Sequence, residues 1–339
     1  MLTELITDTL IIPHASPVPG LAFRRFRGES DFAPLTAIIN ACNAADQIEM
    51  VMTPEETAAE YRHPMNCDPS TDMLFAEIDG EMMGFACVGW QDLDGGERVY
   101  RHRGFVHPHW RRRGIGGALF RWNEERARQI AARYPNGRPR FLQVWTFDSN
   151  VSKCALAERE GYTVARRGYE MRRDTLDDLA DAPLPAGLQL RPVRDEHIRP
   201  IWDAMVEAFR DHWGAGTLTD ADFASWRDHP IFDRRLWRIA WAGDQVAGIC
   251  INVIPHEENT HYNRRLFWID DLAVRRPWRK RGVASALLVE SMRFMRDEQG
   301  MTSAGLGVDT ENISGALRLY ARLGFRPVES SSTYRKPMR

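Results

Sequence analysis

The stretch that decides the fold is Val106-His-Pro-His-Trp-Arg-Arg-Arg-Gly-Ile-Gly116, because the chain repeats its pattern without a gap. The second copy is Val274-Arg-Arg-Pro-Trp-Arg-Lys-Arg-Gly-Val-Ala284, which begins 168 residues after the first. A repeat at this distance in a chain of 339 residues indicates two tandem copies of one fold. The length agrees, since domains usually hold about 100–200 residues.

The residues around the two stretches repeat as well. Each copy reads as a first strand, a hairpin, a strand that leads into the Arg-rich segment, a helix and another strand. Asp79-Gly80 and Gly243-Asp244 are the hairpin signals, because such dipeptides favour tight turns between apolar runs. The alternation predicts an α/β fold with a mixed sheet covered by helices. The predicted strands are 21–26, 98–106, 141–147, 188–193, 265–274 and 303–308, and the predicted helices are 116–132 and 284–298.

The domain boundaries follow from the repeat and from the composition between the copies. Residues 174–186 are acidic and contain prolines, which is typical of an exposed linker. We therefore predict an N-terminal domain at 21–173 and a C-terminal domain at 187–339. Residues 1–20 lack the basic start and the cleavage site of a secretory signal, and we interpret them as a leader with little structure.

Composition excludes several classes of protein. The net charge is −2, and basic residues gather only in short clusters, so we expect no nucleic-acid partner. Hydrophobic residues make up 43% and charged residues 27%, and no apolar run reaches the roughly 18 residues of a membrane span. The sequence therefore predicts a cytoplasmic protein without a membrane partner. Five cysteines lack ligand spacing, so we expect reduced, mostly buried thiols and no metal: Cys42, Cys67, Cys87, Cys154 and Cys250.

The Arg-rich segment between a strand and a helix predicts an anion site. Backbone N–H groups at a helix N-terminus lack partners, and the helix dipole favours negative charge there. Gly282 and Ala284 let an anion approach the backbone, and Arg279 and Arg281 can add charge-assisted hydrogen bonds. An Arg-rich helix start is by itself more often a solvated surface. The small residues and the repetition in the first copy favour a phosphate or pyrophosphate site.

These motifs resemble those of the GNAT superfamily of N-acetyltransferases, whose signature is Arg/Gln-x-x-Gly-x-Gly/Ala after the fourth strand. Both copies match the signature, and Asn312 with Leu319-Tyr320 and Gly324-Phe325 matches a later family motif. The resemblance covers nearly the whole chain after about residue 20. The tandem arrangement is similar to that of mycothiol-synthase-like proteins, a likeness of architecture that assigns no substrate.

The resemblance implies acetyl-CoA as acyl donor and assigns residues to it. The backbone amides of residues 281–284 would hold the pyrophosphate, and residues 272–274 would lie along the pantetheine arm, where their strand parts from the strand ending near Asp309. The same three residues also suit ordinary strand core. The implied cofactor-binding residues are Leu272, Ala273, Val274, Arg279, Lys280, Arg281, Gly282, Val283, Ala284 and Asn312, and in the first copy Arg111, Arg113, Gly114 and Gly116.

The two copies differ at the positions that the resemblance links to chemistry. Tyr320 stands where the family commonly protonates the departing thiolate, whereas the aligned residue in the first copy is Ala157. Asp270 and Asp271 precede the pantetheine strand, where one of them could serve as general base. Strand alternation would send the two carboxylates to opposite faces, but the family has a bulge near this point that leaves the choice open, and we slightly prefer Asp270. A salt bridge for the aspartates and a packed aromatic for Tyr320 are the structural alternatives.

The sequence thus favours an N-acetyltransferase whose C-terminal domain carries catalysis and whose N-terminal domain is degenerate. A primary amine would attack acetyl-CoA directly in a ternary complex, with an unidentified small molecule or peptide as acceptor. The alternative is a CoA-binding regulator or scaffold without transferase activity. Monomer and homodimer stay open. Aromatic residues of the second copy that could line the acceptor pocket, or else serve in packing and capping, are His212, Trp213, Trp226 and Trp237.

Overall fold

The computed structural model describes residues 9–13, 17–62, 66–312 and 315–338. The chain forms two compact units. Unit 1 consists of Met1–Ala165 with Thr333–Arg339, and unit 2 of Arg166–Ser332. Most of the predicted leader, residues 1–8 and 14–16, lies outside the described residues, but Thr9–Leu10 form a short strand, β1, which pairs with the first strand of the sheet.

Unit 1 is built on a mixed sheet, as the sequence predicts. Neighbouring strands from β1 to β5 are antiparallel, whereas β5 and β6 are parallel. The strand order is β1-β2-β3-β4-β5-β6-β13, where β2 is Leu21–Arg24, β3 Met73–Ile78, β4 Glu81–Asp92, β5 Arg98–Val106, β6 Arg140–Phe147 and β13 Arg326–Pro337. The α-helices are α1 Phe32–Ala45, α2 Pro54–Arg62, α3 Pro69–Asp72, α4 Ile115–Arg133 and α5 Val151–Arg159.

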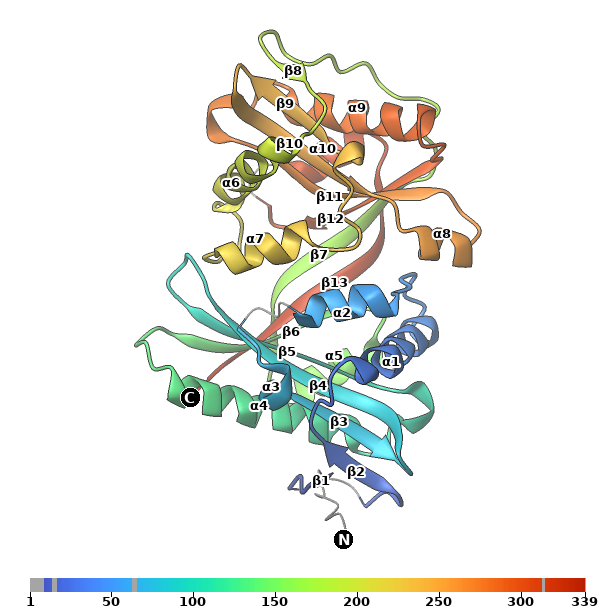
Figure 1. The fold of residues 1–339 in the computed structure, drawn as a ribbon, viewed down its shortest axis with the longest axis vertical. Coiled ribbons are helices and arrows are strands. Elements are labelled where there is room, and N and C mark those ends of the chain that lie inside the picture. Colours follow the sequence, from blue (N-terminus) through green and yellow to red (C-terminus); the bar gives the residue numbers. More distant parts are fainter. Residues whose placement is uncertain (1–8, 14–16, 63–65, 313–314, 339) are drawn as a thin grey trace, which may run out of the picture. The chain divides into compact units, whose positions relative to one another are not determined.

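Alternation along the strands of unit 1 decides which helix covers which face. Met73 and Phe75 of β3 pack in one cluster with α1, whereas Leu74 and Ala76 pack in another cluster with α4. Successive side chains of a strand point to opposite faces, so the helices lie on opposite sides of the sheet. Figure 1 shows α4 along one face and α1 with α2 on the other.

Unit 2 repeats this plan, again with a mixed sheet. Strands β11 and β12 are parallel, whereas β12 with β7, β11 with β10, β10 with β9 and β9 with β8 are antiparallel. The order is β7-β12-β11-β10-β9-β8, where β7 is Thr163–Arg173, β8 Gln189–Leu190, β9 Arg238–Ala242, β10 Gln245–Val253, β11 Leu266–Val274 and β12 Ser303–Asp309. The α-helices are α6 Ile198–Phe209, α7 Asp220–Arg227, α8 His256–His261, α9 Val283–Asp297 and α10 Ala316–Arg322.

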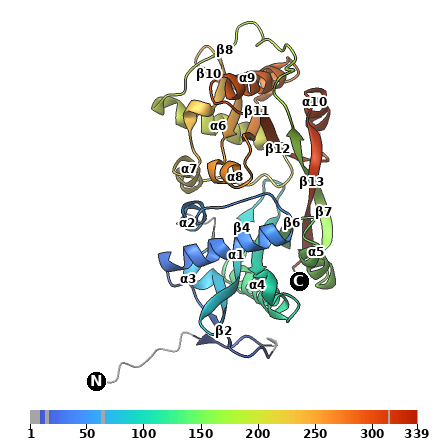
Figure 2. The ribbon, with the colours of Figure 1, turned by 90° about the vertical axis from the view of Figure 1, so that its right-hand side faces the viewer.

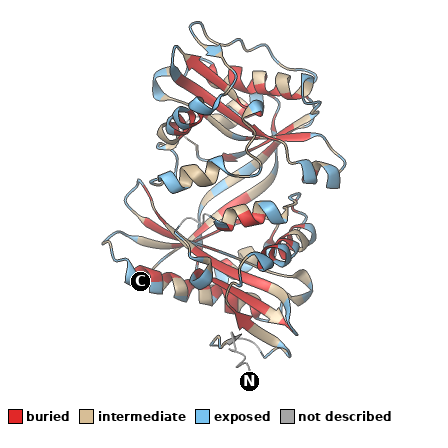
Figure 3. Cartoon of the chain, in the orientation of Figure 1, coloured by how far each residue is buried: buried red, intermediate tan, exposed pale blue. Residues whose placement is uncertain are grey.

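Most sequence-predicted elements are confirmed within one or two residues at each end. The hairpin turns lie where the dipeptides indicated, and Asp79, Gly80 and Gly243 all have positive φ, which favours tight turns between twisted strands. The predicted strand 188–193 is shorter than expected, because only Gln189 and Leu190 pair with β9. Figure 3 shows buried residues concentrated along the strands and on the inner faces of the helices of each unit.

The last strand of each sequence repeat is divided between the two folded units. Strand β7 begins in unit 1, but residues 168–173 pair with β12 of unit 2. Strand β13 in turn begins in unit 2 and ends in unit 1, where Lys336 Nζ bonds Glu124 Oε1 at 2.8 Å and Tyr334 is buried. Figure 2 shows both strands. The division into units thus falls within β7 and within β13, whereas the predicted boundaries at 173 and 187 describe copies of the sequence.

The acidic linker at 174–186 is not simply exposed, contrary to the sequence interpretation. Leu176 is 1% exposed and belongs to the core of unit 2. Arg296 of α9 donates a 3.0 Å hydrogen bond to the Leu176 carbonyl oxygen, and Leu179 and Leu184 pack against the same core. The segment thus carries apolar side chains that pack against the core of unit 2.

None of the described helices is long and apolar enough to cross a membrane.

Candidate active site

The Arg-rich loop has the same backbone conformation in both units. Arg112 and Lys280 have φ of 63° and 59°, and Gly114 and Gly282 have φ of 85° and 87°. Each glycine then caps a helix that receives no side-chain cap, so the first N–H groups of α4 and α9 stay available. Alternating right- and left-handed residues turn successive N–H groups into a concave anion site. The geometry fits a pyrophosphate at either loop.

The first arginine of each loop braces the loop from inside. Arg279 bonds Asp211 Oδ2 at 2.7 Å and the carbonyl oxygens of Val274 and Ala208 at 2.9 and 3.1 Å. Arg111 likewise bonds Asp46 and the Val106 carbonyl oxygen. We therefore revise the sequence interpretation: these two guanidinium groups hold the loop against a helix end. Arg113 and Arg281 are exposed at the loops.

Each loop is preceded by a strand whose end is separated from the neighbouring parallel strand. Strands β5 and β6 pair only as far as Arg101 with Gln143, although both strands continue beyond these residues. Strands β11 and β12 pair only as far as Ile269 with Leu306. The unpaired ends, 270–274 in unit 2, leave backbone groups free to bond an extended ligand. Leu272, Ala273 and Val274 lie on this splayed end, where the sequence resemblance puts the pantetheine arm.

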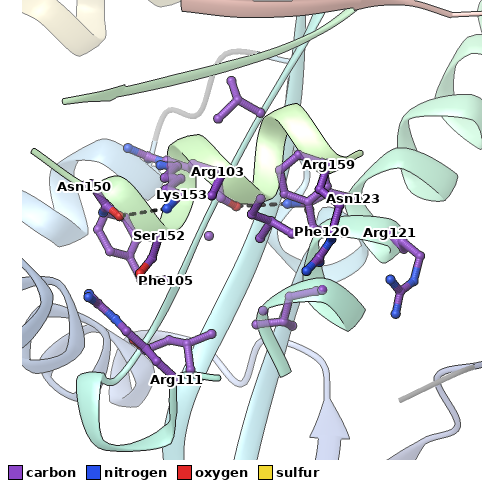
Figure 4. Close-up of a pocket in the computed structure, with 18 of the residues that line it drawn as sticks. Arg103, Phe105, Arg111, Phe120, Arg121, Asn123, Asn150, Ser152, Lys153 and Arg159 are labelled. Carbon is purple, nitrogen blue, oxygen red and sulfur yellow. Dashed lines mark hydrogen bonds between the residues drawn. The ribbon is translucent and has the colours of Figure 1, made fainter. Parts of the chain in front are cut away.

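Unit 1 contains a cavity of about 390 Å³ beside its loop. Figure 4 shows Arg111 on one side of this cavity and Asn150, Lys153 and Arg103 on another. Its wall includes Gly114 and Gly116 of the loop and the splayed end of β5. The cavity therefore joins the anion site to the gap between the strands. We call it the loop cavity.

A second cavity of about 520 Å³ in unit 1 shares part of its wall with the loop cavity. Apolar side chains from α1, the segment after it and β6 line much of it, including Ile48, Met50 and Trp145. We call it the far cavity. Five residues line both cavities: His102, Arg103, Phe105, Asn150 and Lys153. The sequence analysis missed both cavities, because they form between segments that are far apart in the chain.

Unit 2 has a β-bulge next to its splayed strand. Ile251 pairs with Asp271 and the next residue, Asn252, pairs with Ile269, so Asp270 has no opposite residue. A bulge interrupts the ladder and aims a side chain or a backbone group away from it. The bulge that the family resemblance led us to expect near the two aspartates is therefore present at this point of β11. The bulge stands directly before the three residues of the predicted pantetheine strand.

The two aspartates of the bulge share an environment that favours their neutral forms. Burial, and next the charge of Asp270, raise the pKa of Asp271 to about 7. Asp270 is exposed as a residue, but desolvation of its carboxyl group still raises its pKa, with the charge of His229 acting in the opposite direction. A carboxyl group with a pKa near 7 can accept and release a proton at neutral pH. Perturbed carboxylates of this kind are concentrated at functional sites.

The corresponding strand of unit 1 is an unbroken ladder. Strands β4 and β5 pair residue by residue from Gly84 with Val106 to Asp92 with Arg98. His102 takes the place of Asp270 in the repeat and lies 2.7 Å from the Tyr162 hydroxyl. Burial lowers the pKa of His102 to about 3, so the ring is neutral. Unit 1 thus lacks both the bulge and the carboxylate pair.

Tyr320 and Ala157 occupy matching places at the ends of α10 and α5. The carbonyl oxygen of each accepts a 3.0 Å hydrogen bond from the residue five positions later, Phe325 N and Tyr162 N. Tyr320 is 7% exposed, and burial raises its pKa above its ordinary value. Its hydroxyl bonds no described residue. Tyr320 is therefore a protonated donor at neutral pH, whereas Ala157 is fully buried and has no proton to give.

The aromatic side chains proposed for the acceptor pocket divide into two groups. Trp237 is 1% exposed and packs 5.2 Å from Trp226 in the core, so the interpretation that it lines a pocket is wrong. His212 packs edge-on against Phe209 at 4.6 Å, as expected for a helix-end histidine. Trp213 is 37% exposed. Asn312 borders residues 313–314, which lie outside the described residues, and its predicted role stays a prediction.

The cysteines and possible metal ligands add no further centre. All five cysteines are free thiols, and Cys42, Cys87 and Cys250 are buried. In the described parts of the chain, no group of three or more His, Cys, Asp or Glu side chains could hold a metal ion.

Comparison with known proteins now decides the family. The Acetyltransferase (GNAT) family matches residues 41–162 and matches again at residues 198–325. The chain belongs to this family. It is a tandem GNAT acetyltransferase, one repeat in each match, and acetyl-CoA is the donor that the family uses. The paired loops and splayed strands of the two units fit that donor.

Several curated relatives resemble the chain over most of its length. The mycothiol acetyltransferase of Salinispora arenicola is 30% identical over 293 residues, which cover 83% of this chain and 86% of the relative. The mycothiol acetyltransferase of Salinispora tropica is 29% identical, with 94% of this chain and 92% of the relative covered. The similarity therefore includes both repeats.

Solved structures agree on the tandem fold. A GCN5-related N-acetyltransferase from Sphaerobacter thermophilus matches with a TM-score of 0.67 at 27% identity, over 94% of this chain and 96% of the other. A tandem GNAT protein from the clavulanic acid biosynthesis pathway also has a TM-score of 0.67, at 17% identity over 94% of this chain and 98% of the other. The second likeness concerns the fold alone.

Proposed function

We propose that unit 2 transfers an acetyl group from acetyl-CoA to a primary amine by direct attack in a ternary complex. The observation that carries this assignment is the bulge at Asp270 on β11, beside the splayed strand and two carboxyl groups of raised pKa. Unit 1 has the same loop but an unbroken ladder at this place. The catalytic groups thus accompany only one of the two loops.

Each group has a separate task in this scheme. The carboxylate pair at Asp270 and Asp271 removes the proton of the attacking amine, and a pKa of about 7 suits Asp271 to that task. Backbone N–H groups freed along β11 polarise the thioester carbonyl. The Tyr320 hydroxyl then gives its proton to the departing thiolate. No covalent enzyme intermediate is needed.

We propose an amine related to mycothiol as the acceptor, because that compound gives the relatives their name. The test measures thiol release from acetyl-CoA with a panel of primary amines that includes the desacetyl form of mycothiol. Initial rates at varied concentrations of both substrates should give intersecting double-reciprocal lines, as a ternary complex requires. Parallel lines would contradict direct attack and indicate an acyl-enzyme.

The second candidate function is a CoA-binding regulator or scaffold. The loop cavity of unit 1 favours it for that unit, since the cavity adjoins an intact loop without carboxylate pair or tyrosine. Calorimetry with acetyl-CoA distinguishes the two functions. Saturable binding without turnover of any amine would support the regulator for the whole chain, whereas turnover by unit 2 confines it to unit 1.

A further inference from the structure

The lysines of this protein are few, and one of them lies in the wall between two cavities. Only three of the 45 basic Lys and Arg residues are lysines: Lys153, Lys280 and Lys336. Arginine stays charged at any physiological pH, whereas a lysine amine can lose its proton and become a nucleophile. The three lysines are therefore the side-chain amines that an acyl donor could modify.

The three amines have different surroundings. Lys336 donates hydrogen bonds of 2.8 Å to Glu124 and to the Glu160 carbonyl oxygen, so its amine is held by two partners. Lys280 is exposed on the loop of unit 2. Lys153 lines both cavities of unit 1, with Nζ 5.2 Å from the Phe105 ring centroid. Among the described residues, no carboxylate forms an ion pair with Lys153.

The fold keeps Lys153 in this place. Asn150 caps α5 by accepting a 3.0 Å hydrogen bond from the Lys153 backbone N–H, which fixes the lysine in the first turn of the helix. A positive charge at a helix N-terminus is unfavourable. Burial, with Arg103 nearby, lowers the pKa of Lys153 to about 8. The amine is thus partly neutral at physiological pH.

The position of Lys153 is also the place where an acyl group would arrive. The loop cavity joins the anion loop to the gap between β5 and β6, so an acyl-CoA with its pyrophosphate at the loop and its arm in the gap would bring its thioester to the shared wall. Counted from the aligned residues Asn150 and Asn312, the second copy has Gly315 where the first has Lys153. An amine at this position of the repeat is therefore present in unit 1 and not in unit 2.

We propose that Lys153 is an N-acylation site, modified by the acyl-CoA that binds the loop of its own unit. The neutral amine nitrogen forms a bond to the thioester carbonyl carbon, and the carbon–sulfur bond breaks. The nitrogen loses one proton as the amide forms, the departing thiolate gains one, and CoA leaves as the thiol. The inference rests on the proposed use of acetyl-CoA, but it involves unit 1 and no amine acceptor.

An amide at Lys153 changes the wall between the cavities. The side chain loses its positive charge and gains an acyl group that fills part of the space beside Phe105. Unit 1 would then retain a covalent record of acetyl-CoA supply, as expected of a regulatory copy. This deepens the second candidate function for unit 1 by naming the residue that responds.

The experiment incubates the full chain with acetyl-CoA and follows the acetylation of each lysine by peptide mass spectrometry. At pH 8 the neutral fraction of Lys153 exceeds that of an ordinary lysine on the order of a hundredfold. We expect Lys153 to be acetylated at least tenfold faster than Lys336, which lies outside both loops and is the internal control for reaction in solution, and also faster than Lys280, which lies on the loop of unit 2. Equal rates at the three lysines would overturn the proposal.

Two further arms separate this proposal from the function of unit 2. Gly114→Trp, which obstructs the loop of unit 1, should abolish Lys153 acetylation, whereas Gly282→Trp should leave it and stop amine turnover. Excess CoA without an acyl group should suppress Lys153 acetylation in the unmodified chain, a control that needs no variant. Acetylation that ignores both CoA and Gly114→Trp would contradict the proposal. If the unmodified chain acetylates Lys153 but turns over no amine, the result contradicts only the function proposed for unit 2.

Discussion

The two units share a cofactor loop but differ in the strand that precedes it. Their loops match in φ within a few degrees, and the first arginine of each bonds an aspartate and a valine carbonyl oxygen. The strand of unit 2 is bulged at Asp270, whereas that of unit 1 runs unbroken past His102. The backbone of the loop is therefore the same in the two copies, although the register of the preceding strand differs.

The contributions of the two loops to turnover can be measured separately by obstructing one loop at a time. Gly282→Trp should lower kcat/KM for acetyl-CoA by about 10³-fold or more, because it removes at least two charge-assisted hydrogen bonds of about 1.5–3 kcal/mol each. Gly114→Trp is the matched control and should change turnover little. Thiol-release kinetics measure both, with circular dichroism to verify folding. The reverse result would assign catalysis to unit 1.

The carboxylate pair gives a second difference between the units. Asp271→Asn should lower kcat by about 10²-fold, since it removes the proposed general base. In the unmodified enzyme kcat/KM should rise with pH through about 7, because Asp271 must lose its proton to act and its carboxyl is protonated below that pKa.

The pH profile provides the control for this prediction. In Asp271→Asn the rise of kcat/KM near pH 7 should disappear. Any rise that is caused by titration of the acceptor amine should remain, because both enzymes use the same acceptor. Asp270→Asn is the matched variant and tests the sequence-based preference for Asp270. An unchanged profile in both variants would exclude the pair from proton transfer.

The proton donor gives a smaller effect. Tyr320→Phe keeps the aromatic ring that packs against Phe325 but removes the hydroxyl. We expect kcat to fall about tenfold with KM unchanged, at the low end for general acid catalysis, because a thiolate is a good leaving group. Steady-state kinetics measure the split. A rise in KM with constant kcat would indicate a binding role instead.

The smallest expected effect is on stability, in a variant that tests whether unit 1 can be given catalytic activity. Ala157→Tyr copies the residue of unit 2, but Ala157 is fully buried against Tyr100 and Phe120. Overpacking should reduce the free energy of unfolding by about 1–3 kcal/mol without adding turnover. Val151→Tyr, at an exposed position of the same helix, is the control. New activity in Ala157→Tyr combined with Gly282→Trp would contradict this.

The sequence by itself determined the tandem GNAT architecture. The gapless repeat, the turn dipeptides and the apolar periodicity are local signals, and local backbone preferences decided the elements they predicted. The glycine of each loop identified the anion site for the same reason, because a left-handed residue is needed there whatever surrounds it. Tyr320 and Ala157 could likewise be aligned from the Gly-Phe and Gly-Tyr that follow them.

Only the tertiary structure decided how the side chains are used. The bulge at Asp270 depends on register against β10, the arginine braces depend on Asp46 and Asp211 from distant helices, and the cavities around Lys153 need segments that the sequence does not connect. The division into units within β7 and β13 has the same origin. Which surface a strand or a cation contacts is set by long-range packing, and a pattern of neighbouring residues carries no record of it.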